Sequence, residues 1–306
     1  MRFVISGGTG LIGSLLRTRL SKEGHTAVVL SRSEGHTRVL SPSVETEHWD
    51  GIQQGPWTNR LERADAVINL AGESIGSGRW TSSRKRKLLD SRIVPTRTLV
   101  EAIRRATHKP SVLVNASAVG YYGSVPEGDV TETHPPGSDF LATLCTQWEE
   151  EATAARDLGI RVVILRFGVI LDRHALAFKR LILPFRLFAG GWLGNGSQWF
   201  PWVHGDDVAG SILFAAGNRS LSGPFNVAAP ETVTMKEFSK TLGSVMRRPC
   251  WAPVPGFILT TALGEMAGMV LTGQRVVPRK IQTAGFTFQH PSLKRALEAI
   301  LLYPPS

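Results

Sequence analysis

The chain opens, after its first methionine, with Arg2-Phe3-Val4-Ile5-Ser6 and then Gly7-Gly8-Thr9-Gly10-Leu11-Ile12-Gly13. The first run is short and apolar, which predicts a buried strand. Leucines recur at helical spacing from Leu11 onward until Gly24, which predicts a helix. The glycines in a strand-turn-helix unit allow a tight turn, a close approach to a pyrophosphate and close helix packing. The stretch therefore predicts a dinucleotide-binding turn, and a plain tight turn is the alternative.

The end of the second predicted strand distinguishes between the two nicotinamide cofactors. This strand covers 26–31, so it ends at Ser31, and Arg32 follows directly. A site that prefers NAD places an acidic residue near this point to bind the ribose 2′-hydroxyl. Ser31, Arg32 and Ser33 at the strand end carry no carboxylate, and Arg32 can pair with a 2′-phosphate. We therefore predict NADP(H) rather than NAD(H), with a solvated charge at the strand end as the alternative for Arg32.

Strand and helix patterns alternate over the first half of the chain. Apolar runs recur at 66–70, 112–115 and 161–165, and helical patterns lie at 89–103 and 139–158. This alternation predicts an α/β fold, a Rossmann-like doubly wound parallel sheet with helices on both faces. We expect a cofactor domain over 1–167 and a smaller α/β substrate lobe over 168–306. An alternative returns residues 203–229 to the first domain.

Composition limits the class of protein. Of 306 residues, 42% are hydrophobic, which is enough for a folded core. No apolar run reaches the ~18–20 residues that span a bilayer, and the amino terminus does not resemble a signal peptide. Two cysteines that lie far apart, Cys145 and Cys250, suit a reducing compartment. We expect a cytoplasmic protein without a disulfide scaffold.

The positive charge is concentrated in one segment. The formal net charge is +10, and residues 79–109 hold ten basic side chains against two acidic ones, Asp90 and Glu101. Pro95 interrupts the helical pattern there, where it either kinks the helix or marks its effective start. No nucleic-acid motif accompanies the charge. We predict a solvated helix face, with no nucleic-acid and no membrane partner.

Four segments carry a resemblance to a known family. They are the glycine turn at 7–13, Asn69-Leu70-Ala71-Gly72, Ala116–Gly123 (ASAVGYYG) and Phe200–Ala209 (FPWVHGDDVA). In these segments the chain resembles the extended short-chain dehydrogenase/reductase superfamily, in its NAD(P)-dependent epimerase/dehydratase branch. The resemblance covers the whole chain.

Further segments narrow the resemblance. Asn69–Glu73 (NLAGE), Ser91-Arg92, Tyr121-Tyr122-Gly123, Phe200-Pro201-Trp202 and Gly273–Pro278 (GQRVVP) are similar to an atypical, epimerase-like subgroup that ends in a domain of unknown function. The resemblance and the glycine turn together imply NADP(H) as cofactor. The expected cofactor-binding residues are Gly7, Thr9, Gly10, Leu11, Ile12, Gly13, Ser31, Arg32, Leu70, Ala71, Gly72, Arg92, Gly168 and Ile170.

The catalytic pair of the superfamily is missing. Its Tyr-x-x-x-Lys motif places an ammonium group one helical turn from a phenol, where it lowers the phenol pKa. No such pair occurs here. With Glu149 aligned to the acidic residue that usually follows the motif, the two positions hold Leu141 and Cys145. The catalytic candidates are Ser117, Tyr121 and Tyr122, although both tyrosines also suit a packing role.

The substrate lobe contains a segment rich in glycine and aromatic residues at 184–202. Such a segment suits either a pocket wall or an aromatic interface between lobes. By resemblance we expect a sugar nucleotide or another small carbonyl or hydroxyl substrate. The expected substrate contacts are Glu73, Arg186, Trp202 and His204. Glu73, His204 and Asp206 are further acid/base options, although His204 also suits a structural role and Asp206 a helix cap.

Two functions stay open from the sequence. The first is an epimerase-like oxidoreductase with a non-standard active site. The second is an inactive NADP(H)-binding protein that reports redox state or binds a partner. The histidine and cysteine spacing predicts no metal site. A homodimer is a reasonable expectation for a soluble enzyme.

Overall fold

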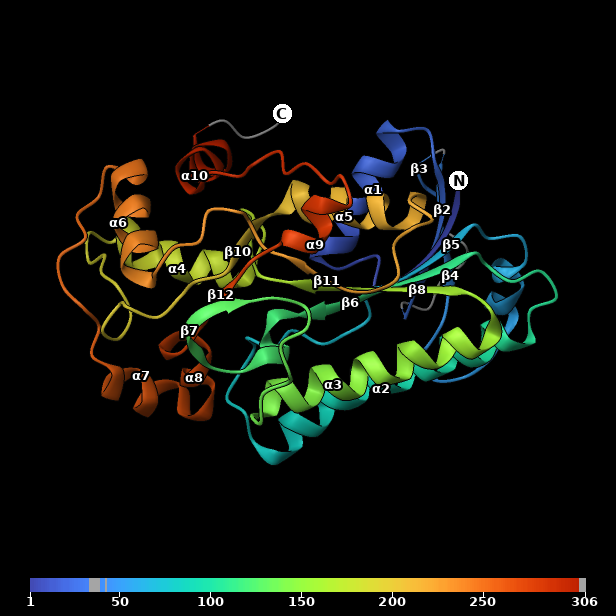
Figure 1. The fold of residues 1–306 in the computed structure, drawn as a ribbon, viewed down its shortest axis with the longest axis horizontal. Coiled ribbons are helices and arrows are strands. Elements are labelled where there is room, and N and C mark those ends of the chain that lie inside the picture. The colour runs from blue at the N-terminus through green and yellow to red at the C-terminus, as the bar shows by residue number, and fades with distance from the viewer. Residues whose placement is uncertain (33–38, 42, 303–306) are drawn as a thin grey trace.

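The computed structural model describes residues 1–32, 39–41 and 43–302, and its main feature is an eight-stranded sheet (Figure 1). All neighbouring strands are parallel except the last pair, which is antiparallel. In spatial order the strands are β11 (Gly223–Val227), β8 (Arg161–Phe167), β6 (Val112–Ala118), β5 (Ala66–Asn69), β1 (Arg2–Ser6), β2 (Thr26–Ser31), β4 (Val44–His48) and β3 (Val39–Ser41).

Helices cover both faces of this sheet. On one face lie α1 (Leu11–Lys22) and α5 (Gly205–Gly217), and on the other lie α2 (Ser82–Arg105) and α3 (Phe140–Thr153) (Figure 1). Alternate strand residues therefore enter different cores: Phe3 and Ile5 pack with α1, whereas Val4 packs with α2. This alternation follows from the two-residue period of a strand. The predicted doubly wound α/β fold is confirmed.

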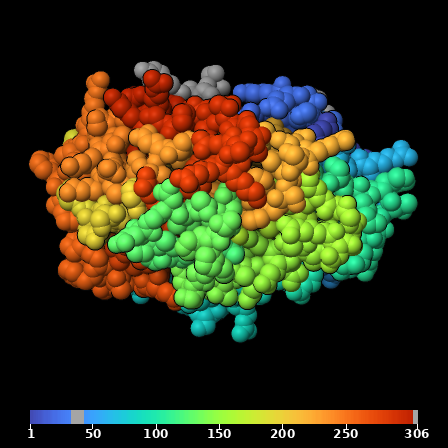
Figure 2. Space-filling model, in the orientation of Figure 1, coloured from blue at the N-terminus to red at the C-terminus, as the bar shows by residue number. Residues whose placement is uncertain are grey.

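A smaller lobe is built mostly from the second half of the chain, drawn in yellow to red in Figures 1 and 2. It holds two short parallel pairs, β9 (Val169–Leu171) with β10 (Trp202–His204) and β7 (Val125–Val130) with β12 (Gln274–Val276). Its longer helices, α4 (Leu176–Arg186), α6 (Met235–Met246) and α10 (Leu293–Leu301), share one apolar core. Shorter helices are α7 (Gly256–Leu263), α8 (Gly268–Leu271) and α9 (Arg279–Thr283), and 3₁₀ turns are η1 (Pro56–Leu61), η2 (Val119–Tyr122), η3 (Ala154–Leu158) and η4 (Gly264–Ala267).

The chain returns to the first lobe after β10. Helix α5 packs against α1, and β11 forms the edge of the large sheet beside β8. Residues 205–217 and 223–227 thus lie in the cofactor lobe, although they follow 168 in sequence. The division of the chain at residue 167 stays a prediction.

Helix α2 corrects one local expectation. It begins at Ser82 and continues through Pro95 to Arg105, so the proline lies inside the helix and does not mark its start. The Thr81 hydroxyl oxygen accepts the Arg84 N–H and caps the first turn. The whole basic segment from Arg84 to Arg105 is therefore carried on one helix. No helix of the described residues combines the length and hydropathy needed to cross a bilayer.

Gly13 offers a direct test of how α1 is seated on the sheet. A Cβ at this position would overlap the backbone of Gly8. We expect Gly13→Ala to lower the free energy of unfolding by about 1–3 kcal/mol, because backbone and not a flexible side chain must shift. Gly217→Ala is the matched control in α5, where a Cβ meets nothing within 4 Å, and should be neutral or slightly stabilising. Equal denaturant midpoints for the two variants would contradict this packing.

Candidate functional site

The glycine turn joins β1 to α1 and touches the next strand. Gly7 has a positive φ of 67°, and a Cβ there would overlap the Leu70 carbonyl at the end of β5. A Cβ on Gly10 would meet only the Gly7 carbonyl oxygen, at 3.3 Å. Gly10 precedes α1 without a side-chain cap, so the first amides of the helix are open to an external acceptor. The turn has the form of an anion cradle.

The sheet brings most of the predicted cofactor residues to one edge. Strands β2, β1, β5, β6 and β8 are consecutive neighbours and parallel, so their carboxyl ends lie side by side. Ligands of open α/β sheets bind at this edge. The turn residues Thr9, Leu11 and Ile12 lie there with Ser31, Leu70 and Ala71, and Gly168 and Ile170 follow β8.

Arg32 lies at this edge on the surface. Its side chain is 76% exposed, and its guanidinium lies 3.7 Å from a Glu73 carboxylate oxygen. Glu73 also faces Arg84 at 3.5 Å. The Arg32 side chain is thus held only by a long, solvent-exposed ion pair, which contributes little to holding it in place.

Arg92 lies beneath the segment that follows β5. Its side chain is buried against Gly72, where a Cβ would come within 2.9 Å of the guanidinium carbon. It donates to the carbonyls of Glu73 and Leu88, at 2.9 and 3.1 Å. Burial lowers its pKa to about 10, and its Nε has no hydrogen-bond partner among the described residues. Arg92 therefore supports the backbone at Gly72–Glu73 from inside.

A buried amide network ties the neighbouring strands together, and our sequence analysis missed it. Asn69 ends β5, accepts the Ser6 hydroxyl at 2.6 Å, and donates to Asn115 and Thr96 at 2.6 and 2.7 Å. The Trp148 indole donates to the same Thr96 oxygen at 3.0 Å. The signal in the sequence was an asparagine at the end of each of two apolar runs.

Two of the three catalytic candidates point into a second buried network. The Ser117 hydroxyl donates to Glu149 at 2.6 Å, and Glu149 makes a two-pronged ion pair with Arg166. Arg166 also donates to the Tyr122 hydroxyl at 2.9 Å, and that hydroxyl donates to Asn226 at 2.6 Å. The sequence signal for this network was Arg166 itself, because it is a charged residue within an otherwise apolar strand.

This network buries Ser117 and Tyr122. Tyr122 is 1% exposed, and burial raises its pKa to about 12. Ser117 is also buried. Both hydroxyls are engaged inside this network, so of the three catalytic candidates they are the less accessible two.

Tyr121 differs from its neighbour. It is partly exposed, and the Arg166 guanidinium lies 3.5 Å from its ring centroid. The two tyrosine rings meet edge to face at 5.3 Å. The phenol of Tyr121 thus rests on a fixed cation and remains accessible.

The two positions aligned with the missing pair lie on α3 beside this group. Leu141 packs against Gly120, so a side chain at Gly120 would place its Cβ 3.3 Å from the Leu141 Cβ. Cys145 is buried, and burial raises its pKa to about 12. Neither side chain can exchange a proton with a substrate near neutral pH.

The predicted substrate residues separate into two groups. Trp202 is 1% exposed, belongs to the core of the smaller lobe, and donates its indole N–H to the Glu231 carbonyl at 3.0 Å. Arg186 is exposed at the end of α4. Trp202 is therefore too buried to contact a substrate in this structure, whereas Arg186 and Glu73 are accessible.

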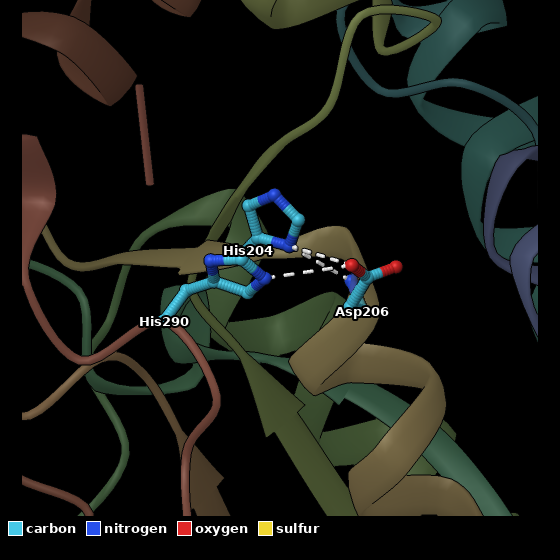
Figure 3. A group of neighbouring side chains, drawn as sticks. All are labelled: His204, Asp206 and His290. Atoms are coloured by element: carbon cyan, nitrogen blue, oxygen red, sulfur yellow. Dashed lines mark hydrogen bonds and ion pairs between the residues drawn. The ribbon is translucent and has the colours of Figure 1, made fainter. Parts of the chain in front are cut away.

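His204 caps a helix. Its Nδ1 accepts the Asp206 N–H at 3.1 Å at the start of α5, and its ring stacks on His290 at 3.7 Å (Figure 3). His204 is buried, so the structural alternative for this residue agrees with its position and the substrate contact does not. Asp207 accepts the backbone N–H groups of Gln289 and His290 and holds that chain segment in place.

His204, Asp206 and His290 place three possible metal-ligand atoms within 4.8 Å of one another (Figure 3). Asp206 Oδ2 lies 3.6 Å from His204 Nδ1 and 3.5 Å from His290 Nε2. However, His204 Nδ1 already accepts the backbone N–H of the helix cap. The group is explained as a cap with an ion pair.

A surface hollow of about 380 Å³ lies away from the glycine turn, at the amino ends of β1 and β2. It is lined by Met1, Phe3, His25 and residues of α1 and α5. The opposite, carboxyl edge carries the cradle and the exposed candidates.

Comparison with known proteins gives two family matches. A model described as the NAD dependent epimerase/dehydratase family matches residues 3–228, and a domain of unknown function (DUF1731) matches residues 254–300. The epimerase family protein YfhF of Bacillus subtilis is 40% identical over 302 residues, which are 98% of each chain.

Two solved structures are similar over the whole chain. The human epimerase family protein SDR39U1 (isoform 2), crystallised with NADPH, has a TM-score of 0.88 and 34% identity, covering 98% of this chain and 99% of that one. UDP-glucuronic acid 4-epimerase from Bacillus cereus, in complex with UDP-glucuronic acid and NAD, has a TM-score of 0.78 and 19% identity, covering 98% of each chain. The second likeness is one of fold.

The buried His204 gives stability a pH dependence. Burial, and then repulsion from His290, lowers its pKa to about 4, whereas a histidine in an unfolded chain titrates near ~6.5. The unfolded state therefore takes up the proton first, and the free energy of unfolding falls as the pH drops from ~6.5 towards 4. His204→Asn keeps an acceptor for the cap and should flatten this fall, by on the order of 1–3 kcal/mol.

The measurement is the denaturant midpoint between pH 7 and pH 4. His174→Asn, at an exposed position, is the control and should keep the wild-type slope. A His204→Asn curve parallel to that of the wild type would show that His204 is not buried as described.

Proposed function

Because this chain belongs to the NAD dependent epimerase/dehydratase family, as its motifs predicted, we propose that it binds NADP(H) at the carboxyl edge of the large sheet. We further propose that it acts as an epimerase-like oxidoreductase on a small carbonyl or hydroxyl substrate. The observation that carries the proposal is the contact between Gly7 and the end of β5, which leaves a cradle at Gly10 over the start of α1.

The residues present fit a dinucleotide. Side chains at Gly7 or Gly13 would fill the space that the turn and helix need, and the Gly10 position is open on its outer side. The open first turn of α1 suits a pyrophosphate. The buried Arg92 Nε without a described partner supplies a further donor close to Gly72. Gly7, Gly10, Gly13 and the amides at Leu11 and Ile12 would hold the pyrophosphate.

Arg32 supports NADP(H) over NAD(H). It lies at the end of β2, where an NAD site carries an acidic residue, and its exposed side chain is free to turn towards a phosphate. Glu73 follows a different strand and pairs with Arg32 from the side. The NADPH in the crystals of the human relative agrees with this preference.

Tyr121 is the proposed proton donor and acceptor. A bound nicotinamide exchanges a hydride with a substrate carbon, and a nearby acid/base must move a proton at the substrate oxygen. Of the three candidates, Tyr121 alone keeps an accessible ring, and Arg166 fixes that ring from one side. Arg166 is itself oriented by Glu149.

The proposed substrate class is a sugar nucleotide or a similar small molecule. Glu73 lies at the edge beside Arg32 and Arg84, and Arg186 supplies an exposed cation in the smaller lobe. A neighbour in fold was crystallised with UDP-glucuronic acid. The proposed location is the cytoplasm, and the proposed assembly is a homodimer.

The second candidate is a protein that binds NADP(H) without turnover, as a redox reporter or interaction protein. The observation that favours it is the replacement of the catalytic pair by Leu141 and the buried Cys145, together with the burial of the Ser117 and Tyr122 hydroxyls.

Arg32→Ala tests the cofactor assignment. We expect it to raise the NADPH dissociation constant by about tenfold or more, because a charge-assisted contact to the 2′-phosphate is lost. The NADH constant should change little. Arg105→Ala, exposed at the far end of α2, is the control for charge alone. An unchanged NADPH constant in Arg32→Ala means that the assignment is wrong.

Tyr121→Phe separates the two candidate functions. Across a panel of substrates, we expect the wild type to oxidise NADPH with carbonyl compounds. With sugar nucleotides, whose hydroxyl-bearing carbons can give up a hydride, we expect NADP+ reduction or a changed sugar configuration. In the variant kcat should fall by about 10²-fold or more with unchanged NADPH binding. Tyr122→Phe is the buried counterpart and should retain turnover if it folds. Wild type without any turnover across the panel supports the binding protein instead.

A further inference from the structure

Helix α7 (Gly256–Leu263) has an unusual surface. Its sequence, GFILTTAL, contains no charged residue, yet none of its side chains is buried. Helices of soluble proteins normally bury their apolar stripe, as α10 does with Leu293, Leu297 and Ile300. Leu259 and Leu263 are half-buried, whereas Phe257 and Ile258 are left largely exposed.

Three large apolar side chains of α7 and α8 are strongly exposed. Phe257 is 72% exposed and Ile258 is 46% exposed, both in the first turn of α7. Met269 of α8 is 44% exposed, and α8 joins α7 through η4. We call Phe257, Ile258 and Met269 the α7 surface. Exposed apolar groups that gather in this way mark interaction sites.

Cations border the α7 surface. Arg79 donates to the carbonyls of Thr261 and Ala262, at 2.5 and 3.0 Å. The Lys85 ammonium group lies 2.5 Å from Glu265, which neutralises the one acidic side chain of η4. These contacts bring the start of α2 beside α7 and α8, at the lower edge of the molecule in Figure 1.

The same turns of α2 carry further positive charge. Residues 79–90 contain five basic residues and one acidic residue, Asp90. Arg84 and Lys85 pair with Glu73 and Glu265, whereas Arg86 and Lys87 are exposed. Apolar side chains next to an excess of cations are complementary to a surface with an apolar interior and anionic head groups. We infer that the α7 surface and the start of α2 dock the protein peripherally on an anionic lipid membrane.

Length and charge both favour this occupant. An eight-residue helix is about 12 Å long and cannot cross the ~30 Å hydrocarbon core, so the contact is with the membrane surface. A second copy is a poorer partner, because a two-fold interface brings the same patch of both chains together. The two basic helix starts would then repel each other. This assignment departs from our expectations of a purely solvated basic face and of no membrane partner.

The test is co-sedimentation of the full chain with vesicles. Phosphatidylcholine vesicles that contain about one-third phosphatidylglycerol are compared with pure phosphatidylcholine vesicles, at low and physiological salt. We expect binding to the anionic vesicles alone and weaker binding at higher salt. The variants F257S/I258S and R86E/K87E should each lose about tenfold or more in affinity.

Matched controls lie elsewhere on the molecule. Ile52→Ser removes a side chain that is 64% exposed on the cofactor lobe. R104E/R105E reverses two exposed charges at the other end of α2, about 30 Å away. Both controls should bind as the wild type does. Thermal unfolding checks that every variant is folded, and the exposed positions make loss of fold unexpected.

Three outcomes overturn the inference. The first is a wild type that sediments no more with anionic than with neutral vesicles. The second is equal affinity of the α7 variant and the Ile52→Ser control. The third is light scattering that shows a dimer without vesicles, which F257S/I258S converts to a monomer, because the surface then belongs to a second copy.

Discussion

The close contact between Gly7 and the Leu70 carbonyl is the constraint on which the rest of the site depends. It requires a residue without a side chain and with a positive φ at the end of β1. It fixes the end of β5 against the turn, and β5 in turn leads into Ala71, Gly72 and Glu73. Arg92 then supports that segment from inside the first lobe. The geometry at the carboxyl edge is thus set by backbone packing and one buried cation.

Helix α3 carries Leu141 and Cys145 at the two positions where the family resemblance predicts the Tyr-x-x-x-Lys pair. Cys145 lies in an apolar environment that keeps its thiol protonated. The buried charge here is the Glu149–Arg166 pair, which holds Ser117 and Tyr122 and lies against the ring of Tyr121. A buried pair of this kind is costly to break by removing one partner. It therefore gives Tyr121 a rigid support, although it occupies two hydroxyls that the sequence offered for catalysis.

The sequence predicted the parts of this structure that have a local signal. The strand at 2–6, the glycine turn and the helix after it follow from periodicity and from the demands of glycine. The sequence offered the return of residues 203–229 to the first domain only as an alternative, and the burial of Trp202 depends on contacts between distant segments, for which spacing carries no information. The cap made by His204 is local, since its ring accepts the Asp206 N–H, but it was one of several roles that the sequence left open for this residue. The sequence could not predict which of the adjacent residues Tyr121 and Tyr122 is buried, because the packing of η2 decides which side chain turns inward. Helix α7 was missed because its apolar pattern has no buried face.

The central claim is that the carboxyl edge of the large sheet is an NADP(H) site. A crystal structure of the chain grown with NADP tests it most directly. The account predicts the pyrophosphate against the amides of Gly10–Ile12, the 2′-phosphate within hydrogen-bonding distance of Arg32, and the nicotinamide beside Tyr121. A dinucleotide bound elsewhere, or a 2′-phosphate that faces solvent away from Arg32, would contradict it.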